Sequence, residues 1–319
     1  MHPWLATPSA RQTTSVGQSR QRISAARNFL HILADPVEPD IDLWCLVLSS
    51  RNSIVAVHGL NPWGRKLHAA ATWTATAGSL WLRDFLPARL PRARIVMFDY
   101  NSNVTFQSST AGVLEQSQSL LNQLELARAG KPNRPLIFIC HSLGGILVKR
   151  ALISAKQSDV YRSIADHTFG IVFFGTPHGG GKIAETGDLV ARIVRRISGR
   201  PKNSFMSALR KDSSLANTIA NDFRQFLEVF QFQSYYETRP LKYFGIVVDQ
   251  KAAVLGLPDT RERSIGLDAD HYDICKFESQ SDPVYRQVEE NIARMVNEAV
   301  KRFEIGRSIP KVAADKSIN

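Results

Sequence analysis

The chain lacks several features that are typical of membrane-spanning proteins, disulfide-rich proteins and proteins with structural zinc sites. No apolar run approaches the roughly 20 residues that a helix needs to cross a bilayer. The three cysteines are an odd number without C-x-x-C spacing, so neither a disulfide framework nor a zinc knuckle is expected. We therefore expect a reducing, intracellular environment and no metal or organic cofactor. Hydrophobic residues make up 44% of the 319 positions and charged residues 22%, a composition typical of a globular protein with a large core.

Acidic residues are absent before Asp35, where Ser, Thr and Arg are abundant. This composition is typical of a mitochondrial transit peptide, and a disordered basic tail explains it too. We expect residues 1–40 to form a disordered or targeting tail.

Basic residues outnumber acidic ones by 40 to 29, which gives a formal net charge of +11. Such a charge favours anionic partners, including a peripheral contact with an anionic membrane, although many basic enzymes bind nothing through their charge. No segment interleaves basic and aromatic residues in the manner of a nucleic-acid platform. Nucleic acid is therefore not an expected partner. The net charge does not indicate which protein, if any, the chain binds.

Short β-branched apolar runs alternate with longer amphipathic stretches from residue 53 onward. Strands are predicted at 53–57, 94–98, 136–140, 169–174, 229–236, 244–248 and 263–267, and helices over 114–126, 144–155 and 284–303. The alternation predicts an α/β fold around a mostly parallel central sheet flanked by helices. We expect one domain over 50–305, with a helical cap inserted at 182–228 and a polar tail over 306–319.

The stretch Phe-Ile-Cys-His-Ser-Leu-Gly-Gly-Ile-Leu places Ser142 between an apolar strand and an apolar helix. A serine nucleophile needs a tight strand-to-helix turn, with small residues two positions before and after it. Gly144 satisfies the second position, and Cys140 stands where G-x-S-x-G has glycine, but it is small. The pattern indicates a nucleophile elbow; the alternative is a structural turn with an incidental serine.

A second motif, Val57-His-Gly-Leu-Asn-Pro, follows the first predicted strand of the domain. Acyl transfer needs two backbone N–H donors aimed at the developing oxyanion. One donor follows the nucleophile, at Leu143, and the other comes from a loop after an early strand, here Leu60. Taken alone, the His-Gly pair is also compatible with a simple β-turn.

Together, V-H-G-L-N-P, C-H-S-L-G-G-I-L-V-K-R-A-L, F-F-G-T-P-H-G-G and the late D-x-x-H-x-x-I-C-K-F resemble the lipase-like serine esterases. These esterases are related to the serine-active-site-containing protein of phosphatidylglycerol remodelling. The same module resembles the N-terminal hydrolase domains of fungal proteins that carry NACHT or ankyrin regions. The resemblance covers roughly residues 50–300. It implies an α/β-hydrolase fold and a Ser-acid-His triad. We expect a protein associated with a mitochondrial or endoplasmic-reticulum membrane, with the cytoplasm as the alternative.

Chain order selects the base among the eight histidines, because the triad of α/β-hydrolases runs serine, acid, histidine. His58 and His141 belong to the two motifs above, and His178 comes before any acid-bearing strand. His271 follows a predicted short strand and precedes the final helix, which is the place of the base.

The acid must follow the next-to-last strand, where it can orient the imidazole. Glu237 ends the predicted strand over 229–236, and Asp249 ends the next apolar piece. The resembled family fits Glu237 better, with Asp249 as the alternative acid.

Apolar residues recur at helical spacing between positions 189 and 197 of the expected cap, opposite Arg192, Arg195, Arg196 and Arg200. Such a helix either docks on anionic lipid or packs on the body with its basic face in water.

These motifs predict a serine hydrolase that cleaves carboxylic ester bonds, with a lipid or other apolar acyl ester as substrate. The alternatives are an acyltransferase in phospholipid remodelling and a hydrolase-fold module used for signalling or protein interaction.

Overall fold

The computed structural model describes residues 29–36, 52–61, 65–102, 111–178, 193 and 216–308. Most of the expected tail over 1–40, most of the expected cap and residues 309–319 lie outside these described residues. The basic stretch over 189–200 is outside them as well, apart from Ile193.

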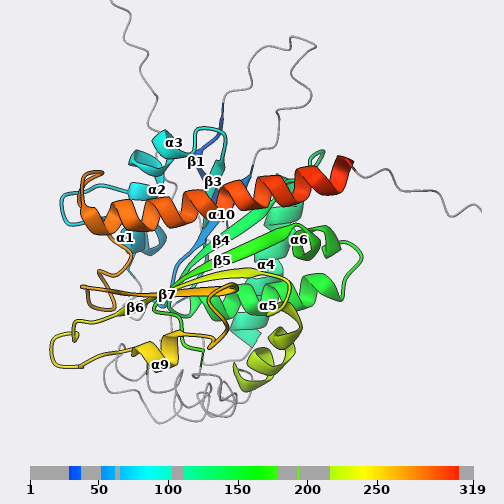
Figure 1. Cartoon of the computed structure of the whole chain (residues 1–319). Helices are drawn as coiled ribbons and strands as arrows, with labels where there is room; N and C mark the ends of the chain where they lie inside the picture. Colours follow the sequence, from blue (N-terminus) through cyan, green and yellow to red (C-terminus); the bar gives the residue numbers. More distant parts are fainter. Residues whose placement is uncertain are drawn as a thin grey trace, which may run out of the picture.

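A seven-stranded sheet forms the centre of the molecule, in the order β1-β3-β2-β4-β5-β6-β7 (Figure 1). β1 runs antiparallel to β3, and all other neighbouring strands are parallel. The predicted α/β fold with a mostly parallel sheet is thus confirmed. The strands are β1 (Phe29–Ala34), β2 (Ser53–Val57), β3 (Arg94–Asp99), β4 (Leu136–His141), β5 (Thr168–Phe174), β6 (Gln231–Glu237) and β7 (Glu262–Leu267).

The central strands are continuous apolar runs because helices cover the sheet on both faces. Every residue of β2, β4 and β5 is buried. The described helical segments are α1 (His68–Trp73), α2 (Trp81–Asp84), α3 (Leu86–Arg89), α4 (Ala111–Ala127), α5 (Gly144–Lys156), α6 (Arg162–Asp166), the 3-10 helix η2 (Phe223–Phe226), α9 (Gln250–Ala253) and α10 (Pro283–Ser308).

Two hydrophobic cores lie on opposite faces of the sheet, because successive strand side chains alternate between faces. The first core joins α1, α2 and α10 to one set of strand residues, such as Ile54 and Ile139. The second joins α4, α5 and α6 to the alternate set, such as Val55 and Phe138. In Figure 1, α10 crosses one face of the sheet, while α4 and α5 lie on the other.

Residues 29–34 correct the prediction of a tail over 1–40. They form β1, which pairs with β3 from Phe29↔Asp99 onward. The pairing satisfies backbone groups, while Leu30 packs against the second core and Leu33 against the first. The basic composition around this segment obscured its apolar alternation.

The strand predicted at 244–248 is also wrong, because the backbone turns sharply there. Tyr243 and Gly245 have φ values of 69° and 71°, and Leu241 bridges to Gly245. A left-handed conformation at two positions breaks an extended strand. The helices α1–α3 were not predicted, since each is only four to six residues long.

None of the helices in the described part of the chain is long and apolar enough to cross a bilayer.

Packing of α10 on the first core contributes to the stability of the domain. Ile292 is fully buried there, so Ile292→Ala should lower the free energy of unfolding by about 3 kcal/mol through a cavity. Arg294 on the same helix is exposed, and Arg294→Ala should change it by no more than about 0.5 kcal/mol. Urea unfolding of both variants measures the difference. Equal changes in the free energy of unfolding would contradict the burial of Ile292 in the first core.

Candidate active site

Ser142 lies on the turn between β4 and α5, with a φ of 51° that non-glycine residues rarely adopt. The turn brings α5 against the end of β2. A Cβ on Gly144 would lie 2.4 Å from the carbonyl oxygen of His58 and 2.5 Å from that of Val57. Only glycine fits this close backbone approach. The strand, sharp turn and helix expected of an elbow are therefore present.

Cys140, two residues before Ser142, is fully buried in the second core. Burial raises the pKa of its thiol, so the side chain stays neutral and acts as a small apolar residue. The substitution of the usual glycine therefore leaves the turn intact.

His271 lies beside Ser142, although 129 residues separate them in the chain. Its Nε2 is 3.0 Å from Oγ of Ser142, and both side chains are buried. This distance is within the range of a hydrogen bond between a nucleophile and its base. The structure thus brings together the two residues that the sequence singled out as nucleophile and base.

Glu237 ends β6 and faces the other side of the His271 ring. Its Oε1 is 3.4 Å from Nδ1 of His271 and accepts a hydrogen bond from the N–H of Val248. The distance of 3.4 Å exceeds that of a typical hydrogen bond and is within the range of an ion pair. Glu237 is 2% exposed, so its carboxylate lies in a medium that strengthens its attraction to the imidazole.

Asp249, the alternative acid, has a different position. It is the N-cap of α9, and its carboxylate accepts a hydrogen bond from the N–H of Ala252 at 2.9 Å. Asp249 is exposed, unlike Glu237. The geometry therefore pairs Glu237 with His271 and gives Asp249 a helix-capping contact.

The loop after β2 lies directly against the elbow. A Cβ on Gly59 would be 2.8 Å from Cβ of Ser142, so glycine is needed for this approach. Leu60 follows Gly59 and Leu143 follows Ser142, and both leucines are half-buried where their neighbours are buried. The two residues expected to supply oxyanion donors thus flank the serine from two loops.

The His58 side chain holds the loop after β2 in place. Its Nδ1 is 2.8 Å from the Gly59 carbonyl, and its Nε2 accepts the backbone N–H of Tyr100 at 3.2 Å. The Tyr100 hydroxyl donates back to the carbonyl of His58 at 2.9 Å, and the two rings stack. His58 is therefore a structural anchor for this loop, in agreement with its exclusion as base.

Asp99 lies beneath this anchor, between two histidines. Its carboxylate is 3.7 Å from His58 and 3.9 Å from His31 of β1. Burial opposes the charge, but the polar contacts with His31 and His58 outweigh it and lower the Asp99 pKa to about 2. A permanent negative charge therefore lies close to His58.

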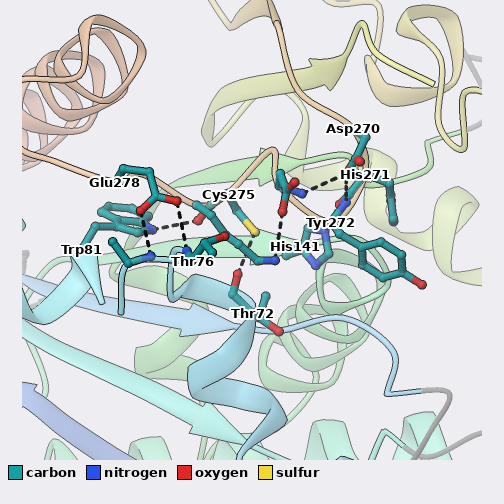
Figure 2. Close-up of polar contacts among 12 residues, drawn as sticks. Thr72, Thr76, Trp81, His141, Asp270, His271, Tyr272, Cys275 and Glu278 are labelled. Atoms are coloured by element: carbon teal, nitrogen blue, oxygen red, sulfur yellow. Dashed lines mark hydrogen bonds and ion pairs between the residues drawn. The ribbon is translucent and has the colours of Figure 1, made fainter. Parts of the chain in front are cut away.

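The loop that carries His271 is fastened to α1 and α2 (Figure 2). The indole N–H of Trp81 donates to the carbonyl of Cys275 at 2.9 Å. The Glu278 carboxylate accepts the backbone N–H groups of Thr76 and Ala77, each at 3.0 Å. These contacts join segments about two hundred residues apart, so they fix the base loop to the body of the domain.

His141 and Asp270 shape the same loop close to the base (Figure 2). Nε2 of His141 donates to the carbonyl of His271 at 2.9 Å, since a carbonyl can only accept. Burial and the nearby His271 lower the His141 pKa well below its usual value, which keeps its ring neutral. Asp270 accepts the N–H of Tyr272 at 2.9 Å. His141 therefore holds the backbone of His271 in place.

A buried lysine lies behind the elbow, on α5. Lys149 is 2% exposed, and its Nζ lies 2.8 Å from Nδ1 of His178, in the loop after β5. Nζ also lies over the rings of Phe173 and Phe223, at 5.6 Å and 5.2 Å from their centroids. Burial lowers the Lys149 pKa to about 7, with Glu262 acting in the opposite direction.

Sequence reasoning missed Lys149 and the role of His178. The signal was present, since Val148, Lys149 and Leu152 share the apolar side of the predicted helix, where a charge needs a partner. His178 was excluded as base on chain order, and the structure places its Nδ1 against Nζ of Lys149. Within the described residues, no group of three or more His, Cys, Asp or Glu side chains is arranged to hold a metal ion.

The lowered pKa of Lys149 predicts a pH-dependent stability. Between pH 7 and 10.5 the unfolded lysine binds a proton that the folded one releases, so the free energy of unfolding rises with pH. Lys149→Met removes this contribution. From pH 7 to 9 the wild type should gain about 2 kcal/mol relative to the variant in urea unfolding. Parallel pH profiles for the two proteins would contradict a buried, neutralised lysine.

Comparison with known proteins finds sequence relatives. Protein SERAC1 of Bos taurus is 29% identical over 219 residues, which cover 65% of this chain and 32% of the relative. Protein SERAC1 of Danio rerio is 30% identical over 219 residues, with the same coverage. The aligned part therefore spans about a third of the length of these relatives. No family model matches the chain.

Solved structures of lipases and esterases are similar at low identity. The mature lipase BlEst2 of Bacillus licheniformis has a TM-score of 0.48 and 16% identity, covering 83% of this chain and 99% of its own. Esterase B of Lactobacillus rhamnosis has a TM-score of 0.49 and 12% identity, covering 81% of this chain and 79% of the esterase chain. The fold assignment rests instead on the strand order and on the elbow at the end of β4. The chain has an α/β-hydrolase fold, resembles the lipase-like serine esterases and has Protein SERAC1 among its sequence relatives.

Proposed function

We propose that this chain is a serine hydrolase that cleaves carboxylic ester bonds of a lipid or another apolar acyl substrate. The observation that carries the proposal is the 3.0 Å contact between Oγ of Ser142 and Nε2 of His271. It occurs on an elbow with a positive φ, at the carboxyl end of a central strand. Parallel α/β sheets bind their ligands at this edge.

In the proposed reaction, Oγ of Ser142 attacks the ester carbonyl while Nε2 of His271 takes its proton. The carboxylate of Glu237 orients the ring and stabilises the imidazolium. The N–H groups of Leu60 and Leu143 stabilise the oxyanion. His271 then protonates the leaving alcohol, which leaves an acyl ester on Ser142. Water attacks this ester while His271 takes a proton from the water, and His271 then returns a proton to Oγ of Ser142 as the carboxylic acid is released.

Acyl transfer in phospholipid remodelling is the second candidate, and the similarity to Protein SERAC1 supports it through the family resemblance. The two reactions share the acyl-enzyme and differ in whether water or an alcohol receives the acyl group. Analysis of products formed with a lysophospholipid acceptor separates them.

A hydrolase-fold interaction module has no need for a buried Ser-His-Glu arrangement, so this third alternative is disfavoured. Contact with an anionic membrane and a mitochondrial or endoplasmic-reticulum location remain part of the proposal.

A fluorophosphonate probe tests the nucleophile. The wild type should be labelled covalently, because the probe reacts with an activated serine and then mimics the tetrahedral intermediate. Ser142→Ala should give no labelling while keeping the wild-type thermal unfolding temperature. Absence of labelling in a folded wild-type sample would refute the enzyme proposal.

Two neighbouring acids give a matched test of the triad. Glu237→Gln should reduce kcat for p-nitrophenyl butyrate by about 10³–10⁴-fold, because a neutral amide no longer stabilises the imidazolium. Asp249→Asn should change kcat by less than about twofold, since asparagine is an equally good N-cap. The reverse ranking in steady-state kinetics would make Asp249 the acid.

A further inference from the structure

Lys149 is a buried charge-bearing group in an apolar place. It projects from α5 between the rings of Phe173 and Phe223, and among the described residues no carboxylate lies within ion-pair distance of it. Burying an amine without a carboxylate partner carries a desolvation cost that a methionine of similar length would avoid. The contact that compensates for this cost is the 2.8 Å hydrogen bond to His178.

The direction of this hydrogen bond follows from the two groups. Nζ of Lys149 carries N–H groups in either charge state, so we take Nζ as the donor and Nδ1 of His178 as the acceptor. Burial, together with the nearby Lys149, lowers the His178 pKa well below its usual value, which keeps the ring neutral and able to accept. The His178 ring also packs edge-on against Phe173 at 4.5 Å, so its orientation is fixed.

His178 ends a short segment, 175–178, that touches the nucleophile and the base. Gly175 passes beneath His271, where a Cβ would lie 3.2 Å from Nδ1 of the imidazole. The Thr176 hydroxyl donates to the carbonyl of Ser142 at 3.0 Å. A shift of this segment would therefore be transmitted to both residues.

The same segment holds the backbone that binds the acid. The N–H of His178 donates to the carbonyl of Ala252 in α9 at 2.7 Å. The segment before α9 includes Val248, whose N–H donates to Oε1 of Glu237. Val248 and Ala252 also share one small hydrophobic cluster. α9 therefore has contacts with His178 on one side and lies next to the acid's hydrogen-bond donor on the other.

We propose that Lys149 and His178 are positioning residues for the triad: their buried hydrogen bond fixes segment 175–178 and, through α9, the Val248 N–H that holds Glu237 towards His271. This inference rests on the proposed function. It adds two residues that act on the reaction without touching the substrate.

Two substitutions of His178 form a matched pair for the test. Asparagine keeps an acceptor oxygen close to the place of Nδ1, whereas leucine has a similar volume and no acceptor. His178→Leu should lower kcat for p-nitrophenyl butyrate about tenfold with KM changed less than twofold, as expected for a small misplacement of catalytic groups. His178→Asn should keep at least half of the wild-type kcat.

A second measurement separates positioning from general loss of structure. In a Glu237→Gln background, Lys149→Met should cause little further loss of kcat, because no carboxylate remains to be positioned. Lys149→Met alone should lower kcat about tenfold while leaving the thermal unfolding temperature at pH 7 equal or higher, since a buried amine is removed.

Three results would overturn the proposal: equal kcat for the asparagine and leucine variants, wild-type kcat in Lys149→Met, or full additivity with Glu237→Gln. Should Lys149→Met fail to fold, the His178 pair decides alone. Fluorophosphonate labelling of wild-type Ser142 is measured in parallel. Labelling without any effect of these variants refutes the positioning pair and leaves the proposed function standing, whereas absent labelling refutes the function itself.

Discussion

The close approach of the first turn of α5 to the end of β2 is the constraint on which the site depends. Gly144 has no side chain, so α5 can begin against the carbonyl groups of Val57 and His58. This approach forces Ser142 into its left-handed conformation and brings Gly59 against it. Ser142 and the loop after β2, which carries the proposed oxyanion donor Leu60, are thus juxtaposed by one packing contact. The strain at Ser142 is sustained because the buried strands on either side leave β4 no freedom to move.

Around this contact, the histidines divide into different physical roles according to the partners of their ring nitrogens. His271 reaches Ser142, whereas His58 bonds backbone groups through both ring nitrogens, His141 bonds one through Nε2, and His178 accepts from Lys149. His58, with both ring nitrogens bonded to backbone groups, therefore has a fixed position and holds the loop after β2. The site therefore has one imidazole directed at the serine and several that hold the loops around it.

The sequence predicted those parts of the site that follow from chain order and local turn chemistry. The elbow, the parallel strands and His271 depend on short motifs, and the structure places them together. The choice between Glu237 and Asp249 depended on which residue ends a paired strand, and the apolar run at 244–248 hid a sharp turn. The Lys149–His178 contact joins two elements that no local pattern relates, so only the tertiary fold shows it.

The position of β1 sets a limit on how much of the N-terminal segment the folded domain can lose. β1 covers the outer edge of β3, and its His31 lies beside Asp99, which in turn neighbours His58 of the loop against Ser142. Without β1, β3 would become an open edge strand with unpaired backbone groups, a known template for aggregation. If a targeting peptide is removed in the cell, cleavage must therefore occur before Phe29. A protease that cut farther along the chain would release a protein with an exposed sheet edge.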